Sequence, residues 1–370
     1  MKIRLAFRRL LSFFVGIIAL MLLIINIPFN FYAKKITNEN YSNWMFETIA
    51  SDKRIINIAM LGAHDAFTNK IKYSSEVDLA SAAAIQTGLP GALIKGFSVR
   101  QSKTQVSNVT DLLKRGVRYF DIRLTYHSKS DTWMTSHTYF SEPFIEILED
   151  INTFLADNPG ELLILDIQHV NGVEYDDLNK FEQIKTLFEN SGVLEYAYLE
   201  GDKSLNLVTY GDVTQNKSKS GVILLSKFEE TDTSFWSYGN SIRSAWANTD
   251  DASRLYDFLD DETAAINAKT ALTGNQMSNH VGIDSTEAFR IMQGVLTMQL
   301  NGNGIIEALK SWSLLSKARN FNPELIGHDH FIIWLTAMPI IMVDYSDSNY
   351  QSFNDTVMEI IIDFNQNIEI

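Results

Sequence analysis

A continuous apolar run is the first feature of the hydrophobic pattern, because no charged residue occurs from Leu10 to Ala33. A helix needs about 20 apolar residues to cross a hydrocarbon core of roughly 30 Å, so the run predicts a transmembrane anchor over residues 10–33. Residues 1–9 then form a basic cytoplasmic tail, and residues 34–50 form a polar stalk that enters a short helix. A cleaved signal peptide is the alternative, but its apolar region is usually only about 7–15 residues long.

Short apolar runs alternate with helical patterns through residues 51–370, which we predict to be one domain. This alternation is typical of a parallel α/β fold. The pattern contains seven strand candidates, and one further strand that the pattern does not reveal would complete a TIM-type (β/α)8 barrel. Such a barrel would carry insertions and need not be regular. An open doubly wound sheet is the alternative, but it would need a glycine-rich loop after its first strand, and GAHDAF is not one. The strand candidates are 54–61, 117–124, 132–137, 161–167, 221–226, 291–298 and 338–345.

One amphipathic helix stands out between the third and fourth strand candidates. Its apolar residues recur at helical spacing from Phe144 to Leu155, and Pro159-Gly160 follows as a stop signal. Two other stretches, 66–108 and 229–285, are weakly patterned. We expect these stretches to be insertions or loops over the site.

Composition and charge exclude several classes of protein. Of 370 residues, 45% are hydrophobic and 21% charged, which excludes wholesale disorder, and the absence of cysteine excludes disulfides and thiolate zinc sites. The net charge is −14, and without the six basic residues of the first 35 positions the remainder carries −20, so no nucleic-acid partner is expected. Four basic residues precede the apolar run and two follow it, which favours a single-pass protein of the cell membrane with an extracytoplasmic domain.

Candidate catalytic residues lie where predicted strands end. His64 and Asp65 directly follow the first strand candidate, and His137 ends the third. Barrel enzymes carry their catalytic groups at the carboxyl ends of strands, although a lone His-Asp pair is more often structural. Two histidines from separate strands, together with an arginine, suit general acid–base cleavage of a phosphodiester.

The second strand candidate supplies that arginine. Tyr119, Asp121 and Arg123 share one strand face, and the apolar residues share the other. The carboxylate and the guanidinium are either a structural ion pair or an anion site, because arginine binds phosphate in a bidentate way.

Several motifs occur in order along the chain: RIINIAMLGAHDAF, LLKRGVRYFDIRL, the strand-end His137, and FLADNPGELLILDIQHV. From about Trp44 to Tyr345 the chain resembles the X domain of phosphatidylinositol-specific phospholipases C. AFRIMQGVLT and MPIIMVDYSD are similar to the last two strands of that family. The NPGELLILDIQH stretch looks closest to the branch that consists of the X domain alone.

The resemblance implies roles for individual residues. His64 would be the general base that activates the inositol 2-hydroxyl, and His137 the general acid for the diacylglycerol oxygen. Asp65 would support His137. Asp344 would orient His64, an assignment that rests on the local pattern VDYSD alone. The substrate would be a phospholipid in a bilayer, and the product a cyclic inositol phosphate.

Other residues are expected to contact the substrate. Arg123 would bind the phosphate with Asp121 beside it, whereas Asp166 and Gln168 share a strand face and would contact sugar hydroxyls. Lys227, after the strand candidate GVILLS, is either a phosphate or inositol contact or a solvated lysine. Gln168 lies where bacterial phosphatidylinositol enzymes tend to have lysine, which leaves the headgroup open.

His169 shares the strand parity of Leu165 and Ile167, so we predict it to be a buried structural histidine. The calcium-dependent branch of the family carries Glu-x-Asp where this chain has Asp121-Ile122-Arg123. A cation therefore stands in the place of a metal-binding carboxylate, and we predict no metal and no cofactor. Two alternatives stay open: a phosphodiesterase of the same barrel type acting on a glycerophosphodiester or sphingolipid, and a catalytically silent domain that binds lipids or glycans.

Overall fold

A single sheet of mainly parallel strands forms the centre of the computed structural model. The structure describes residues 2–25, 40–82, 88–201, 203–229, 232–269, 287–299 and 312–367. The parallel strands follow the order β7-β6-β5-β2-β1-β10-β9-β8, and each pairs in parallel with its neighbours. Their bounds are β1 Met60–Ala63, β2 Val117–His127, β5 Leu162–Asn171, β6 Gly221–Ser226, β7 Phe235–Ser237, β8 Ile242–Arg243, β9 Phe289–Gly294 and β10 Ile340–Val343.

The sheet forms an irregular, open barrel. Within the described ranges no ladder joins β7 to β8, so the two ends of the sheet are not hydrogen-bonded to each other. Both strands are short and lie in the stretch 229–285, whose weak pattern did not identify them. The parallel α/β class is confirmed.

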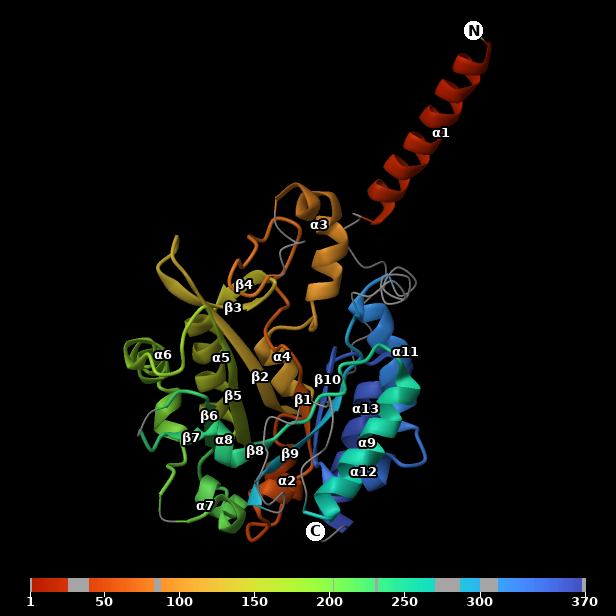
Figure 1. Ribbon diagram of the computed structural model, residues 1–370. Coiled ribbons are helices and arrows are strands. Elements are labelled where there is room, and N and C mark those ends of the chain that lie inside the picture. Colours follow the sequence, from red (N-terminus) through yellow and green to blue (C-terminus); the bar gives the residue numbers. More distant parts are fainter. Residues whose placement is uncertain are drawn as a thin grey trace.

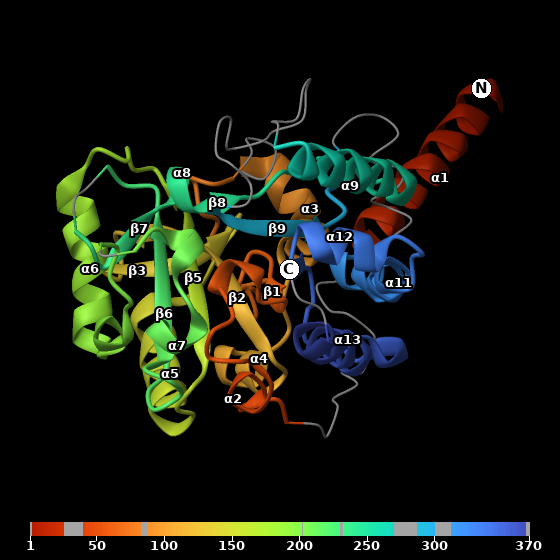
Figure 2. The same cartoon turned by 90° about the horizontal axis from the view of Figure 1, so that it is seen from below.

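Helices cover the outside of the sheet (Figures 1 and 2). Helix α5 buries its apolar face from Phe144 to Leu155, as its periodicity predicted. The α-helices are α1 Lys2–Ile25, α2 Trp44–Thr48, α3 Gly88–Ser102, α4 Val109–Lys114, α5 Phe144–Asp157, α6 Leu178–Ser191, α7 Tyr210–Thr214, α8 Tyr238–Ser241, α9 Ala252–Asn267, α11 Leu314–Ile326, α12 Phe331–Ala337 and α13 Phe353–Asn367. Short 3-10 helices are η1 Ile55–Asn57, η3 Val193–Tyr196, η4 Leu205–Leu207 and η6 Tyr350–Ser352.

The first strand is shorter than its apolar run predicted. Strand 54–61 was expected, but η1 occupies its first half and β1 begins only at Met60. The buried Arg290 donates to the Ile56 carbonyl at 3.4 Å and to Asn57 Oδ1 at 2.9 Å. The backbone N–H of Ile55 also donates to the Val208 carbonyl at 3.0 Å, so this segment is held by Arg290 and by Val208.

The third strand candidate is a strand, but not a parallel stave of the barrel. β3 (Thr132–His137) pairs antiparallel with β2 and with β4 (Tyr139–Pro143). The connection between β2 and β3 is too short for a parallel crossover, which needs a dozen or more residues. β3 therefore forms a hairpin with β2, and its last residue, His137, lies away from the hairpin turn, towards the middle of β2.

The two weakly patterned stretches are not simply loops, because they contain α3 and α9. Helix α9 begins after Asp251, whose side chain accepts a hydrogen bond from the backbone N–H of Arg254, and it buries Leu255, Phe258 and Leu259. Its acidic outer face obscured this apolar spacing. Residues 270–285 of the second stretch lie outside the described residues.

Helix α1 covers part of the predicted membrane segment 10–33, and it extends away from the barrel beside α3 (Figure 1). Residues 26–39 lie outside the described residues. In the part of the chain that the structure describes, no helix is both long and apolar enough to cross a membrane. The predicted transmembrane anchor is therefore not supported.

A buried ion pair joins β2 to the start of β5 at the amino ends of the strands. Arg118 Nη2 lies 2.7 Å from Glu161 Oε2, and both side chains are fully buried. Glu161 also accepts a hydrogen bond from the backbone N–H of Phe46 at 3.1 Å, which attaches α2 to the barrel.

Candidate active site

The candidate site lies where the carboxyl ends of β1, β2 and β10 meet. His64 and Asp65 directly follow β1, Arg123 is on β2, and Asp344 directly follows β10. β1 pairs with β2 on one side and with β10 on the other. The sheet order therefore places His64 between Arg123 and Asp344, at the edge where barrel enzymes keep their catalytic groups.

His64 and Asp344 form a close pair. His64 Nδ1 lies 2.7 Å from Asp344 Oδ1, and the aspartate is buried. Because a carboxylate accepts, Nδ1 carries the proton and Nε2 is left to exchange a proton with a substrate. Burial lowers the pKa of His64, but the carboxylates of Asp65 and Asp344 outweigh that effect and raise its pKa to about 9.

Asp65 connects the other charged groups of the site. Its Oδ2 lies 3.6 Å from His64 Nε2 and 3.3 Å from His137 Nδ1. Its Oδ1 contacts the guanidinium of Arg123. Burial raises the pKa of this carboxyl, but Arg123 and the two histidines more than compensate and hold its pKa well below the usual range. Asp65 also has a positive φ of 40°, a conformation that costs energy in a residue other than glycine.

His137 reaches Asp65 from the end of β3. Its Nδ1 also lies 2.9 Å from the carbonyl oxygen of Ser102, the last residue of α3. Since a carbonyl only accepts, Nδ1 donates, and Nε2 is free to deliver or take a proton. The two histidines thus have matching orientations, each with Nδ1 directed at an acceptor of the protein.

Arg123 lies among these groups. Its Nη2 is 3.4 Å from Asp121 Oδ2, from His64 Nε2 and from Gln168 Oε1. The guanidinium is partly exposed, so it can approach a bound anion while the buried carboxylates compensate its charge. The structure therefore brings together seven of the candidate residues selected from the sequence: His64, His137, Asp65, Asp344, Arg123, Asp121 and Gln168.

The same carboxylates must be tested as a metal site. Single ligand atoms of His64, Asp65 and Asp121 lie within 4.8 Å of one another. Calcium wants six to eight oxygen ligands, and these residues offer two carboxylates and an imidazole. The guanidinium of Arg123 also contacts both carboxylates and would repel a cation. These residues fit a divalent cation poorly.

Asp166 and Lys227 lie beside this cluster: Asp166 pairs with Asp121 across β5 and β2, and Lys227 directly follows β6. Asp166 is fully buried, and its Oδ2 accepts a hydrogen bond of 2.6 Å from the hydroxyl of Tyr119. Burial raises the pKa of Asp166 to about 8, while it lowers the pKa of Lys227. Lys227 Nζ lies over the ring of Tyr238, 4.5 Å from its centroid. Neither residue contacts the two histidines directly in the described hydrogen bonds and ion pairs.

His169 belongs to the edge of the site, and its prediction as a buried structural histidine is wrong. The register between β2 and β5 shifts after Ile122, so that Arg123 pairs with His169. The shift inserts Gln168 as an extra residue in β5 and breaks the simple alternation of strand faces. His169 is partly exposed, and burial together with Arg123 and Lys227 lowers its pKa to about 4, so it is neutral. No signal in the sequence marks this bulge.

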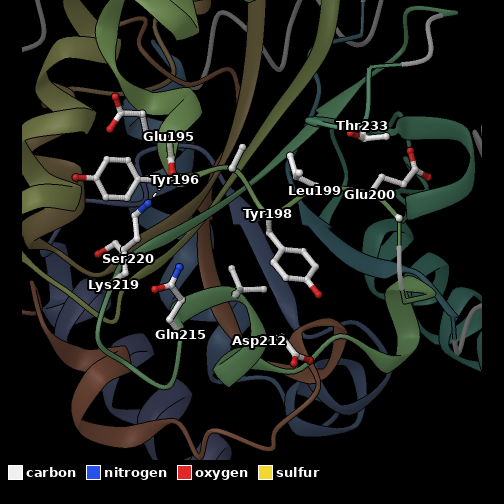
Figure 3. A pocket seen from close by; sticks show the side chains of 13 residues that line it. Glu195, Tyr196, Tyr198, Leu199, Glu200, Asp212, Gln215, Lys219, Ser220 and Thr233 are labelled. Carbon is white, nitrogen blue, oxygen red and sulfur yellow. Dashed lines mark hydrogen bonds between the residues drawn. The ribbon is translucent and has the colours of Figure 1, made fainter.

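A separate hollow of about 410 Å³ lies near the amino end of β6 (Figure 3). Tyr196, Tyr198 and Lys219 line it, and none of the predicted site residues does. Because the histidines lie at the carboxyl ends of the strands, the hollow is at the opposite end of the sheet.

Known proteins resemble the chain in sequence. The bovine PI-PLC X domain-containing protein 3 is 27% identical over 226 residues, which cover 59% of this chain and 68% of that protein. The variant-surface-glycoprotein phospholipase C of Trypanosoma brucei brucei is 30% identical over 174 residues, which cover 44% of this chain and 47% of that enzyme. The chain is similar to the phosphatidylinositol-specific phospholipase C X-domain family. No family model matches it.

Solved phosphatidylinositol-specific phospholipases C share the fold. The enzyme from Listeria monocytogenes superposes with a TM-score of 0.55 at 16% identity, covering 89% of this chain and 100% of that one. The enzyme from Staphylococcus aureus gives 0.54 at 15% identity, covering 90% and 98%. The predicted resemblance to phosphatidylinositol-specific phospholipases C is confirmed, and with it the TIM-barrel type.

Proposed function

We propose that the protein is a phosphodiesterase of the phospholipase C type that cleaves a phosphoinositide-type phosphodiester by histidine acid–base catalysis. The observation that carries the proposal is the position of Asp65, whose carboxylate lies 3.6 Å from His64 and 3.3 Å from His137 and also contacts Arg123. Two imidazoles and a guanidinium therefore surround one small region. The names of the sequence relatives and of the solved structures support the same reaction class.

The reaction transfers a phosphoryl group between two oxygens of the substrate. His64 Nε2 removes the proton of the inositol 2-hydroxyl, whose oxygen attacks the phosphorus. The bond from phosphorus to the diacylglycerol oxygen breaks, and His137 Nε2 donates its proton to that oxygen. The products are a cyclic inositol phosphate and a diacylglycerol. Arg123 stabilises the negative charge that builds on the non-bridging oxygens.

The same geometry supports catalysis without a metal ion. The positive charge that calcium would bring is already supplied by Arg123, which Asp65 and Asp121 hold in place. Arginine also offers two parallel N–H donors to a phosphate. We therefore propose that neither calcium nor magnesium is required.

Phosphatidylinositol in a bilayer is the proposed substrate. Asp166, Gln168 and Lys227 are the proposed contacts to the headgroup, since Gln168 Oε1 lies 3.4 Å from Arg123 Nη2 and the charges of Asp166 and Lys227 interact with Arg123. Because Gln168 is neutral where related bacterial enzymes tend to have lysine, the identity of the headgroup must be determined by experiment. A domain that works on bilayer lipids encounters its substrate at high local concentration.

A headgroup panel tests this proposal. Vesicles that contain phosphatidylinositol, sphingomyelin or phosphatidylcholine are incubated with the purified protein and with His64→Ala, and water-soluble phosphate esters are measured. We expect release from phosphatidylinositol alone and loss of that release in His64→Ala. Release only from another headgroup, or binding to vesicles without release, would replace this function by the alternative enzyme or by a silent binding domain.

We also propose that the domain acts outside the cytoplasm. The support is the charge pattern, because four basic residues precede the apolar run 10–33 and two follow it. Protease added to intact cells should digest the domain, and protection until the cells are lysed would contradict this location.

A further inference from the structure

The last residue of α3, Ser102, and the next three residues, up to Gln105, cross the site at the carboxyl ends of β1 and β10. We call these residues the strap. Each makes a hydrogen bond to a site residue or to a neighbour of one: the Ser102 carbonyl to His137 Nδ1, the Lys103 carbonyl to the Tyr345 hydroxyl, Thr104 Oγ1 to the Asp65 carbonyl and Gln105 Nε2 to the His64 carbonyl. The strap lies in the stretch 66–108, to which the sequence assigned no function.

Of the four strap residues, Gln105 has the side chain with the most hydrogen bonds to residues around the site. Its Nε2 donates to the His64 carbonyl at 3.0 Å and to the Val343 carbonyl at 3.3 Å. Its Oε1 accepts from both the backbone N–H and the hydroxyl of Ser346, each at 3.3 Å. The side chain is fully buried, so every polar atom of its amide is used inside the protein.

These bonds continue the pairing of β1 with β10. The last paired residues are Ala63 and Val343, and the backbone N–H of His64 donates to the Val343 carbonyl at 3.1 Å. Gln105 supplies the next hydrogen bonds, at the point where the strands separate into loops. The residues that follow this point on the two strands are His64 and Asp344.

Thr104 supports the neighbouring residue in a similar way. Its Oγ1 donates to the Asp65 carbonyl at 2.8 Å, and its carbonyl accepts from the backbone N–H of Tyr345 at 2.7 Å. Its own N–H donates to Thr68 Oγ1 at 3.0 Å. These bonds fix the backbone of Asp65, which has the unfavourable φ of 40°.

We propose that Gln105 is a positioning residue that holds the backbones of His64 and Asp344 in register, so that the imidazole and the carboxylate stay at hydrogen-bond distance. The expected loss of catalytic rate rests on the proposed function, whereas the positioning of His64 and Asp344 does not. Without the amide, two buried carbonyls lose a donor, and the ends of β1 and β10 are free to move apart. A misplacement of about 1 Å can cost about 100-fold in rate.

Gln105→Met is the direct test, because methionine has nearly the same length and shape but cannot donate. We expect kcat on phosphatidylinositol vesicles to fall about 10- to 100-fold with KM within about twofold, since the dyad and not the substrate contacts is displaced. Proton NMR supplies a readout that needs no turnover. The low-field signal of the His64 Nδ1 proton, assigned by its absence in Asp344→Asn, should weaken or disappear in Gln105→Met.

Asn365→Leu is the matched control. Asn365 is also a buried amide, and it exchanges hydrogen bonds of 2.9 and 2.8 Å with the backbone of Ala59, just before the opposite end of β1. We expect this variant to lower the melting temperature but to keep kcat and the low-field proton signal. Gln105→Asn, which retains a shorter amide, serves if Gln105→Met does not fold and should give an intermediate loss of the signal.

A folded Gln105 variant with the wild-type signal and wild-type kcat would overturn the positioning role. If the signal is lost in Gln105→Met but wild-type protein cleaves no phospholipid, the positioning role stands and the proposed function fails. If wild-type protein is active and Asn365→Leu loses the signal as well, the effect is general instability and the positioning role is rejected.

Discussion

His64 Nδ1 lies 2.7 Å from Asp344 Oδ1, although 280 positions separate the two residues in the chain. The cause is the sheet order, which sets β1 beside β10 with Ala63 opposite Val343. The next residue on each strand is a member of the pair. The first and last described strands along the chain, β1 and β10, thus bring together the imidazole and the carboxylate of one catalytic pair.

Removal of the Asp344 carboxylate should change the pH profile in a direction that identifies the role of His64. The carboxylates raise the pKa of His64 to about 9, and a general base must be neutral, so kcat/KM of the wild type should rise with pH towards about 9. In Asp344→Asn the pKa of His64 falls towards its ordinary value. The acidic limb should therefore shift to lower pH, while the maximal rate also decreases.

The opposite assignment of the histidines predicts a different shift. If His64 were the general acid, Asp344→Asn would move the alkaline limb to lower pH and leave the acidic limb in place. Profiles of kcat/KM between pH 5 and 10 distinguish the two results. Asp347→Asn is the control, since Asp347 is a nearby buried aspartate outside the contacts of His64 described above.

The role of His137 can be tested through the leaving group. His137→Ala should lose about 10²- to 10⁴-fold in rate on phosphatidylinositol, the usual contribution of one acid–base group. A substrate with a p-nitrophenol leaving group needs no protonation, so its cleavage should fall much less. Equal losses on both substrates would contradict a role as general acid.

Arg123→Lys should separate charge from geometry. Lysine keeps one positive charge but offers no fork of two donors, so it cannot match both phosphate oxygens and Asp65 at once. We expect a loss of about 10²- to 10³-fold in kcat, comparable to removal of an oxyanion donor. Wild-type rates in Arg123→Lys, measured with the same vesicles, would show that a point charge is sufficient.

The buried pair at the other end of the barrel should affect stability and not chemistry. Glu161→Gln leaves the fully buried Arg118 without its carboxylate, and breaking such a pair costs about 3–5 kcal/mol. Urea unfolding should show this loss in the free energy of unfolding. The pH profile should keep its wild-type limbs, and a shifted limb would contradict the separation of the two ends.

The sequence alone predicted the strands that have clear apolar runs and the candidate residues on or next to them. Short apolar runs located β2, β5 and β6, and β2 carries Asp121 and Arg123. His64 follows the apolar run 54–61, of which only the last two residues belong to β1. Asp344 was correctly paired with His64 from the resemblance, although the local pattern VDYSD gave little support. Periodicity also located α5 with its buried face.

Other features depend on contacts that a linear pattern does not contain. The bulge that brings His169 to the site is a register shift between two strands. β8 is only two residues long, too short for a hydrophobic alternation. The role of the strap depends on hydrogen bonds from Thr104 and Gln105 to the backbone carbonyls of Asp65 and His64. Every residue has a backbone carbonyl, so the sequence does not indicate these bonds. The transmembrane anchor was inferred from hydropathy, and the described helices do not support it.

Phosphorus NMR of the reaction in excess EDTA is the most direct test of metal-free cleavage by the two histidines. Purified protein is mixed with phosphatidylinositol vesicles, and the signal of a five-membered cyclic phosphodiester is followed over time. We predict that this signal appears at full rate in EDTA and is absent with His64→Ala. No product in EDTA, with activity restored by calcium or magnesium, would contradict the assignment of Arg123 as the cation of the site.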